Sequence, residues 1–322
     1  SPLSSKGLGV RVIYRMVTRM SQTTEPTEEA HVVQFLHPGH EYNCTSLLKH
    51  TEMATVGWKL GNTRHDRKYF DWWGDFLDAD DRPHEGERIG FWGEWEPPSR
   101  VRRINERIVN WGPPAFAHEP LLPSAPPAES HQNTDPLVFG EAFTYSNCQQ
   151  PAKKVLRHLA PGSMILFGRG TYRAGNVGFR LDTCLVVAQS TPRSIRQSDT
   201  RGFDTDLVEN VVTNALFSKG GDQDFVFYTG ATYTEPLDGM FSFFPAVPAN
   251  DHPHGFARPM LEPVGALEGL ISPRHPQGIK ATSVSGREVQ GAWLEIVRQV
   301  RAQGLVLGTH AKAPEVGSYT GG

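Results

Sequence analysis

The chain has 322 residues, of which 38% are hydrophobic, 10% aromatic and 21% charged, and its formal net charge at pH 7 is −3. This composition is typical of a soluble globular protein and excludes collagen-like, coiled-coil and wholly disordered chains. No run approaches the roughly 18 consecutive apolar residues of a membrane-spanning helix, so we expect no membrane partner. The balance of 32 Lys and Arg against 35 Asp and Glu argues against binding of nucleic acid by bulk charge, but it leaves room for a local basic surface.

The cysteine content indicates a reducing compartment. Cys44, Cys148 and Cys184 are too few to form a disulfide framework in a chain of this length, and their odd number leaves at least one thiol over. We therefore expect a cytoplasmic protein. Residues 1–24 contain basic but no acidic side chains. We expect residues 1–30 to form a disordered N-terminal extension, with a transit peptide as the alternative.

A proline-rich stretch divides the rest of the chain. Residues 113–136 contain seven prolines, and proline lacks a backbone donor and fixes φ, which disfavours a helix interior or a central strand. We expect this stretch to connect an aromatic-rich, β-containing part at residues 31–112 with an α+β part at residues 137–322. The two parts could also form one domain.

The N-terminal part contains two predicted strands. His31–Leu36 is a short apolar run that Pro38 ends, and Arg88–Glu96 is a longer strand that Pro97 must end. Residues 69–76 are aromatic and acidic without a clear period, so the pattern assigns no element to them.

The C-terminal part combines strands with isolated helices. Its helices are predicted to begin at Pro151, at a cap formed by Asp204 or Thr205, and at the capping box Ser285–Glu288. The predicted strands are Ser163–Phe167, Leu181–Ala188 and Asp224–Tyr228, with a glycine-rich loop at Gly168–Gly178. Because no steady β-α-β-α alternation is present, the pattern favours an α+β fold with a mostly antiparallel sheet and a few flanking helices, and a barrel-like sheet is one form that it allows.

The most unusual segment is FWGEWEPPS at residues 91–99. On a strand, Trp92, Glu94 and Glu96 would share one face, with Trp95 on the other. Carboxylates two residues apart on a strand are roughly 6.5–7 Å apart, so Glu94 and Glu96 could act as a catalytic acid/base pair. The tryptophans could stack on a base or a sugar ring. The alternative is a half-exposed strand with Trp95 in the core and both glutamates in water.

Arginines follow this segment directly. Arg100, Arg102 and Arg103 could contact phosphate, or they could form a solvated face paired with nearby acids. The glycine-rich loop adds Arg169 and Arg173, which could hold an anion together with backbone N–H groups. The spacing of its glycines fits neither a Walker A loop nor the dinucleotide-binding pattern.

We expect no cofactor and no metal site, with zinc as the alternative. His37, His40 and Cys44 are potential zinc ligands, to which His65, His84 or Cys148 could add. The two histidines of the first set are three residues apart across Pro38-Gly39, so they lie in a turn and do not match helical zinc-protease patterns.

Two resemblances carry further expectations. The blocks 91–99, 162–167 and 228–245 resemble signature blocks of a bacterial protein family, a likeness that implies no particular activity. The run from Val155 to Phe167, a predicted helix that ends in Pro-Gly and leads into a strand, resembles an element of the small β-barrels of the PUA and EVE type. That resemblance implies binding of RNA or modified DNA bases in an aromatic pocket, and a role in nucleic-acid modification or defence.

Three functional hypotheses follow. The first is recognition of a nucleotide or nucleic-acid base, in which Trp92 and Trp95 stack on the base, Glu94 hydrogen-bonds to it and the five arginines contact phosphate. The second is a hydrolase or glycosidase that uses Glu94 and Glu96. The third is a non-catalytic partner-binding protein whose tryptophans are core or interface anchors. Whether the protein is an enzyme and how it oligomerises stay open, and exposure of the tryptophans around a cavity would separate the three classes.

Overall fold

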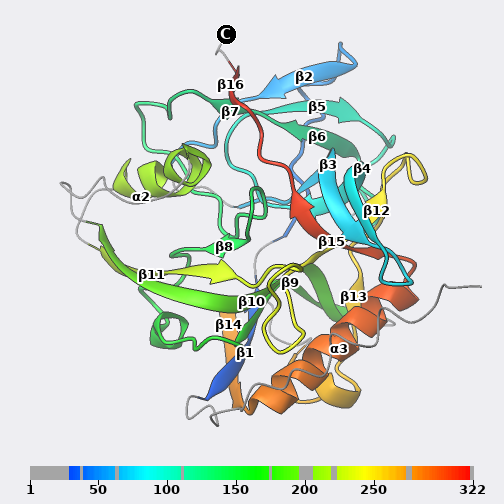
Figure 1. Ribbon diagram of the computed structural model, residues 1–322. Coiled ribbons are helices and arrows are strands. Elements are labelled where there is room, and N and C mark those ends of the chain that lie inside the picture. The colour runs from blue at the N-terminus through cyan, green and yellow to red at the C-terminus, as the bar shows by residue number, and fades with distance from the viewer. Residues whose placement is uncertain are drawn as a thin grey trace, which may run out of the picture.

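Figure 1 shows a computed structural model of the chain, which describes residues 29–36, 39–61, 65–109, 112–173, 176–195, 206–218, 223–272 and 278–319. Strands dominate the described residues and form two seven-stranded sheets and one two-stranded sheet. The N-terminal extension predicted for residues 1–30 lies outside the described residues except for its last two positions.

The first sheet has the strand order β14-β1-β9-β10-β11-β8, and β13 pairs with β10. Its strands are β1 (Ala30–Leu36), β8 (Thr144–Tyr145), β9 (Met164–Arg173), β10 (Asn176–Ile195), β11 (Gln223–Gly230), β13 (Met260–Leu261) and β14 (Gly278–Val284). The β1–β9 pair is parallel and the other pairs are antiparallel. Successive side chains point to opposite faces, so Val32 and Val33 of β1 enter two different hydrophobic cores.

The second sheet has the order β15-β12-β4-β3-β6-β5-β2, with an additional pairing between β15 and β3. Its strands are β2 (Met53–Val56), β3 (Lys68–Leu77), β4 (Pro83–Gly93), β5 (Ser99–Arg103), β6 (Phe116–Pro120), β12 (Phe244–Pro248) and β15 (Val306–Ala311). The β3–β6 pair is parallel and the others are antiparallel. The short strands β7 (Leu122–Pro123) and β16 (Val316–Tyr319) form the two-stranded parallel sheet.

An aromatic core joins the two large sheets. Phe35 and Phe167 of the first sheet pack with tilted rings whose centroids are 5.0 Å apart. On the second sheet, Phe70 and Phe91 lie 5.2 Å and 5.8 Å from the ring of Phe139. All five rings are fully buried, and such aromatic contacts add to the free energy gained by removing their surface from water.

Helices are few among the described residues. They are α1 (Asp206–Val208), α2 (Asn214–Ser218), α3 (Gly286–Ala302), a π-helical turn (Glu209–Thr213) and the 3-10 turns Lys154–Arg157 and Gly265–Leu267. The predicted capping box is confirmed, because the Ser285 hydroxyl accepts from the Glu288 amide and the Glu288 carboxylate accepts from the Ser285 amide. None of the helices in these ranges combines the length and the apolar character that crossing a membrane requires.

The predicted fold class is confirmed only in its coarse form. The chain is rich in mostly antiparallel sheet and has few helices, but each large sheet contains a parallel pair and the sheets do not form a closed barrel. Each of the two predicted parts contributes strands to both sheets, since β1 belongs to the first sheet and β12 and β15 belong to the second.

Several predicted boundaries are wrong. The helix expected from Pro151 is reduced to the 3-10 turn Lys154–Arg157. The expected loop Gly168–Gly178 is the β9–β10 hairpin, in which Gly168 pairs with Leu181. A glycine is needed at this register because a Cβ at residue 168 would lie 2.0 Å from the Arg180 carbonyl oxygen.

Within the proline-rich stretch, β6 is a central strand between β3 and β5, where the sequence predicted none. The strand is tolerated because its proline, Pro120, is its last residue, so the interior of the ladder keeps its donors.

Candidate functional site

A network of buried charged side chains joins the two sheets. Arg67 precedes β3, Glu94 follows β4, and Asp182 lies in β10 of the first sheet. The Arg67 guanidinium donates to the Glu94 carboxylate and, through Nε, to Asp182 Oδ2 at 2.8 Å. Arg258 donates to the other Asp182 oxygen at 2.9 Å. These four side chains are at most 5% exposed, so each charge relies on its partners rather than on water.

The backbone after β4 is held by neighbouring segments. Because β4 ends at Gly93, Glu94 and Glu96 lie beyond the strand, and the expected spacing along one strand face does not apply. The Glu96 amide donates to Thr134 Oγ1 and the Asp135 amide donates to Glu94 Oε1, each at 3.1 Å. Lys68 Nζ donates to the Trp95 carbonyl at 2.6 Å, and its burial lowers the pKa of this lysine to about 8.

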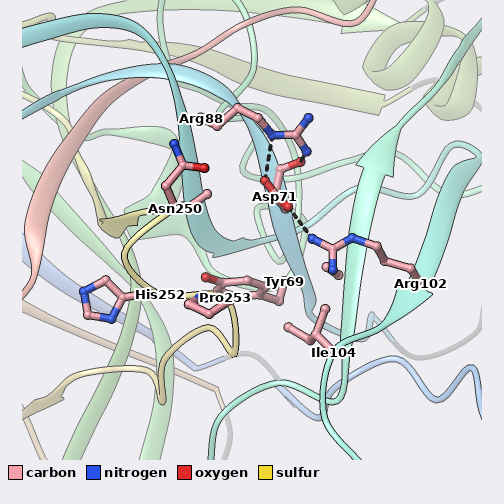
Figure 2. Close-up of a pocket in the computed structure, with 10 residues that line it drawn as sticks. Tyr69, Asp71, Arg88, Arg102, Ile104, Asn250, His252 and Pro253 are labelled. Carbon is pink, nitrogen blue, oxygen red and sulfur yellow. Dashed lines mark hydrogen bonds and ion pairs between the residues drawn. The ribbon is translucent and has the colours of Figure 1, made fainter.

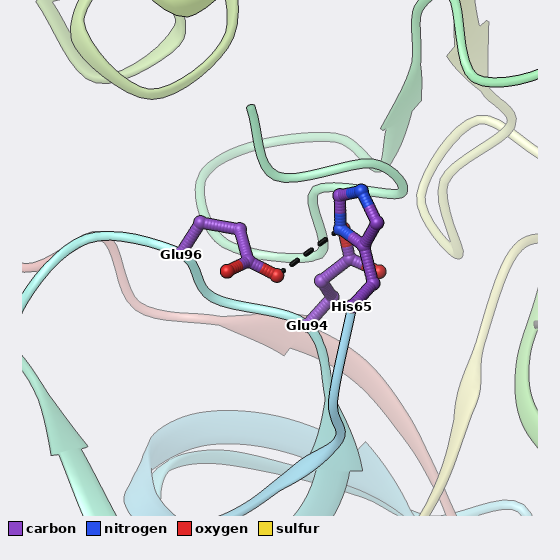
Figure 3. A group of neighbouring side chains, drawn as sticks. All are labelled: His65, Glu94 and Glu96. Atoms are coloured by element: carbon purple, nitrogen blue, oxygen red, sulfur yellow. Dashed lines mark hydrogen bonds and ion pairs between the residues drawn. The ribbon is translucent and has the colours of Figure 1, made fainter. Parts of the chain in front are cut away.

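His65 contacts both glutamates (Figure 3). Its Nδ1 is 2.8 Å from Glu94 Oε1 and 3.1 Å from Glu96 Oε1. Burial alone would lower the pKa of His65, but the two carboxylates raise it to about 10. With 21% of its side chain exposed, His65 is the member of this group that solvent reaches most easily.

A second site lies on the second sheet, on the face of β3 that carries Tyr69 and Asp71. Arg88 Nε donates to Asp71 Oδ1 at 2.9 Å, and Arg102 donates to the other oxygen of the same carboxylate (Figure 2). Arg88 also reaches Glu119 at 3.5 Å, and Arg100 reaches that residue at 3.4 Å. Three cations thus alternate with two anions, a local excess of one positive charge in a chain whose net charge is −3.

Trp73 completes this surface. Its side chain is 42% exposed, and the Arg88 guanidinium lies 5.5 Å from the centroid of its ring. Asp71 and Trp73 are two residues apart in β3 and therefore share one face. We call Asp71, Trp73, Arg88, Arg100, Arg102 and Glu119 the arginine face.

A cavity of about 250 Å³ opens at the arginine face. Asp71, Arg88 and Arg102 line one side, and the loop after β12 contributes Asn250 and His252 (Figure 2). Tyr69 also lines this cavity, and burial raises its pKa, so the phenol is a neutral group that can donate. Its hydroxyl has no hydrogen-bond partner among the described residues. A hydroxyl of a residue that lines the cavity favours a ligand or water that accepts from it.

The tryptophans expected to stack on a base are buried. Trp92 is 4% exposed, and its indole N–H donates to the Phe256 carbonyl at 2.8 Å. The cavity that Trp92 borders has a volume of about 20 Å³, which holds about one water molecule and no base. Trp95 is 1% exposed and donates to the Pro98 carbonyl at 2.9 Å. Both rings belong to the core in this structure.

The five predicted phosphate-contacting arginines do not form one group. Arg100 and Arg102 lie on the arginine face. The Arg103 guanidinium instead lies 5.0 Å from the centroid of the Phe116 ring. Arg169 is far along the chain from these, with Nη1 3.0 Å from His40 Nε2. The side chain of Arg173 lies outside the described residues.

The predicted zinc candidates are not brought together. His37 lies outside the described residues, and His40 contacts Arg169. Cys44 is fully buried, and burial raises the pKa of its thiol to about 12, which disfavours the thiolate that zinc requires. Within the described ranges, the side-chain group with metal-ligand spacing is His65, Glu94 and Glu96. His65 was considered from the sequence only as an additional ligand of the turn.

Sequence reasoning missed Arg67, Asp182 and Arg258 of the network. Asp182 carried the one usable indication, because it is a single acidic residue inside the apolar run from Leu181 to Val187. A lone charge in a buried strand requires a partner, although the pattern does not say which one.

We find no protein-family model, no curated protein and no solved structure that matches the chain.

Proposed function

We propose that the protein recognises a nucleotide or nucleic-acid base at the arginine face. The observation that carries this proposal is that Arg88 and Arg102, oriented by the same Asp71 carboxylate, line one cavity beside the exposed ring of Trp73. The role that the sequence suggested for Trp92 and Trp95 passes to Trp73, because the other two rings are buried.

The chemistry of these groups matches a nucleoside phosphate. Guanidinium groups present planar, always charged donors that suit phosphate oxygens, and an exposed indole offers a surface on which any base can stack. The cavity of about 250 Å³ is smaller than most pockets that enclose a whole ligand. It therefore fits the phosphate and sugar, with the base lying on Trp73 at its rim.

Binding of AMP, GMP, CMP and UMP by calorimetry, and of short single-stranded DNA and RNA by fluorescence anisotropy, tests this proposal. Stacking contributes about 1–3 kcal/mol per base, so Trp73→Ala should weaken binding by about 5- to 150-fold, while Trp73→Phe should keep most of it. Arg102→Ala should weaken binding and reduce its salt dependence, because one phosphate contact is lost. Arg298→Ala, at an exposed arginine on α3, is the matched control and should change neither quantity.

Two results would contradict the proposal. One is the absence of binding to every one of these probes at low salt. The other is unchanged affinity in Trp73→Ala together with unchanged salt dependence in Arg102→Ala.

The second candidate function is hydrolysis by Glu94 and Glu96, which is favoured by their sharing of one imidazole nitrogen. Glycosidases hold their two carboxyl groups about 5–10 Å apart with the sugar between them. Here the His65 imidazole contacts both carboxylates, and the three donor atoms lie within 4.8 Å of one another, which favours an ester or phosphoester substrate over a glycoside. Turnover of p-nitrophenyl acetate and p-nitrophenyl phosphate that is lost in Glu96→Gln would support this function, and equal turnover in that variant would exclude it.

A further inference from the structure

We propose that His65, Glu94 and Glu96 form a binding site for one divalent metal ion. The site is separate from the arginine face, and the inference does not depend on nucleotide recognition. It rests on the spacing of the donor atoms, on the partners of Glu96 and on the support around Glu94.

The three donor atoms lie within 4.8 Å of one another, and the two distances from His65 match those in a coordination shell. Nδ1 of His65 is 2.8 Å from one carboxylate oxygen and 3.1 Å from the other. Ligands that bind a metal at about 2.1 Å with angles of 90–109° are about 3.0–3.4 Å apart, close to these values. A single N–H cannot point along both directions at once, whereas a metal ion that replaces the Nδ1 proton, which is released to solvent, can contact all three atoms together.

Glu96 has few direct partners among the described residues. Its side chain is 2% exposed, His65 is the hydrogen-bonded partner of its carboxylate among the described residues, and the charge of Lys68 acts on it at longer range. An ionised carboxylate offers about four acceptor positions, and burying it with a single partner is costly. A metal ion would add a second direct cationic contact at this carboxylate.

Hydrogen bonds from neighbouring residues hold the Glu94 carboxylate in place, as is usual for metal ligands. One of its oxygens accepts from the Asp135 amide, the other from Arg67, and Arg67 is in turn held by Asp182. Outer partners of this kind fix the orientation of a ligating carboxylate. The Glu94 oxygen that faces His65 is therefore preorganised toward the position between the two side chains.

The ligand set indicates which ions to expect. One imidazole and two carboxylates suit Mn²⁺ and Zn²⁺, and the exposed part of His65 leaves a way in from solvent. Three protein ligands leave coordination positions open for water.

The test uses the full chain after dialysis against EDTA. Titration with MnCl₂ is followed by the electron paramagnetic resonance signal of the free ion, and titration with ZnCl₂ by calorimetry. We expect one ion of either metal per chain, competition between the two, and a nitrogen hyperfine coupling to bound Mn²⁺ from the imidazole.

Loss of a ligand should weaken binding at least about tenfold in Glu96→Gln and in His65→Asn, and His65→Asn should abolish the nitrogen coupling. Glu85→Gln and His158→Asn, at exposed positions, are the matched controls and should bind as the wild type does. Circular dichroism of the same samples reports folding, and either folded variant is sufficient for the comparison.

Two outcomes would overturn the proposal. In the first, the wild type leaves the free Mn²⁺ signal unchanged and gives no heat with Zn²⁺. In the second, a folded variant at residue 65 or 96 binds both ions as tightly as the wild type.

Discussion

Replacing Asp182 by asparagine tests whether the buried network holds the two sheets together. The substitution keeps the shape of the side chain and removes its charge. In the native protein, one Asp182 oxygen accepts from Arg67 at 2.8 Å and the other from Arg258 at 2.9 Å. All three side chains are at most 5% exposed, so water cannot replace the lost carboxylate.

The expected loss of stability follows from these contacts. A hydrogen bond to a charged group contributes about 1.5–3 kcal/mol, and two such bonds are weakened here, which gives about 3–6 kcal/mol. Removal of one partner from a buried ion pair costs about 3–5 kcal/mol by comparison. We therefore expect Asp182→Asn to lower the free energy of unfolding by about 4 kcal/mol, a large share of the 5–15 kcal/mol typical of a folded domain.

Urea unfolding followed by tryptophan fluorescence measures this loss, with Asp80→Asn as the control. Asp80 also accepts from an arginine, Arg82, at 2.7 Å, but its side chain is 73% exposed. Its substitution should change the free energy of unfolding by less than about 1 kcal/mol. A free energy of unfolding for Asp182→Asn within about 1 kcal/mol of the wild-type value would refute this expectation, because the network would then contribute no more to stability than a surface ion pair does.

Three further predictions concern other positions. Gly90→Ala should destabilise the protein by about 1–3 kcal/mol in a thermal unfolding assay and disturb the cavity at the arginine face, because the new Cβ would lie 1.8 Å from the Tyr69 hydroxyl. Gly93→Ala is the control and should have a small effect in the same assay, because its Cβ would lie 3.5 Å from the nearest atom. Burial raises the pKa of Glu41 to about 7 from the ordinary 4.5, so the folded state takes up the proton more readily and stability should fall as the pH rises from 4.5 to 7. This part of the pH dependence should disappear in Glu41→Gln, and an unchanged slope of stability against pH would contradict the assignment. In the native protein we expect at most one thiol, that of Cys148, to react with Ellman's reagent, because the other two cysteines are fully buried. Rapid labelling of a second thiol before the protein unfolds would contradict this prediction.

Features encoded in a few adjacent residues were predicted well. The apolar run at His31–Leu36 becomes β1, and the capping box Ser285–Glu288 begins α3. Both depend on contacts within one turn or on a period along one strand, which the sequence displays directly. The strand β3 was missed because its residues are buried on both faces for much of its length, so no alternation marks it.

The partners of the residues at the candidate metal site could not be predicted from the sequence. The sequence singled out Glu94 and Glu96 as an unusual carboxylate pair, but it placed them on a strand face. Their partners come from distant segments: Arg67 is 27 residues from Glu94, and Asp182 is 115 residues from Arg67. Which charges meet in the interior depends on how the two sheets pack, and no spacing along the chain encodes that.

The tryptophans illustrate the same division. The sequence by itself determined a sheet-rich chain with aromatic residues and arginines close together, and it named Arg100 and Arg102. Only the tertiary structure decided which ring is accessible to a ligand. The loop after β12 covers Trp92, whose indole N–H donates to the Phe256 carbonyl. The same loop leaves the ring of Trp73 exposed beside Arg88. Residue type fixes what a side chain can do, and the burial imposed by distant segments fixes whether a ligand can reach it.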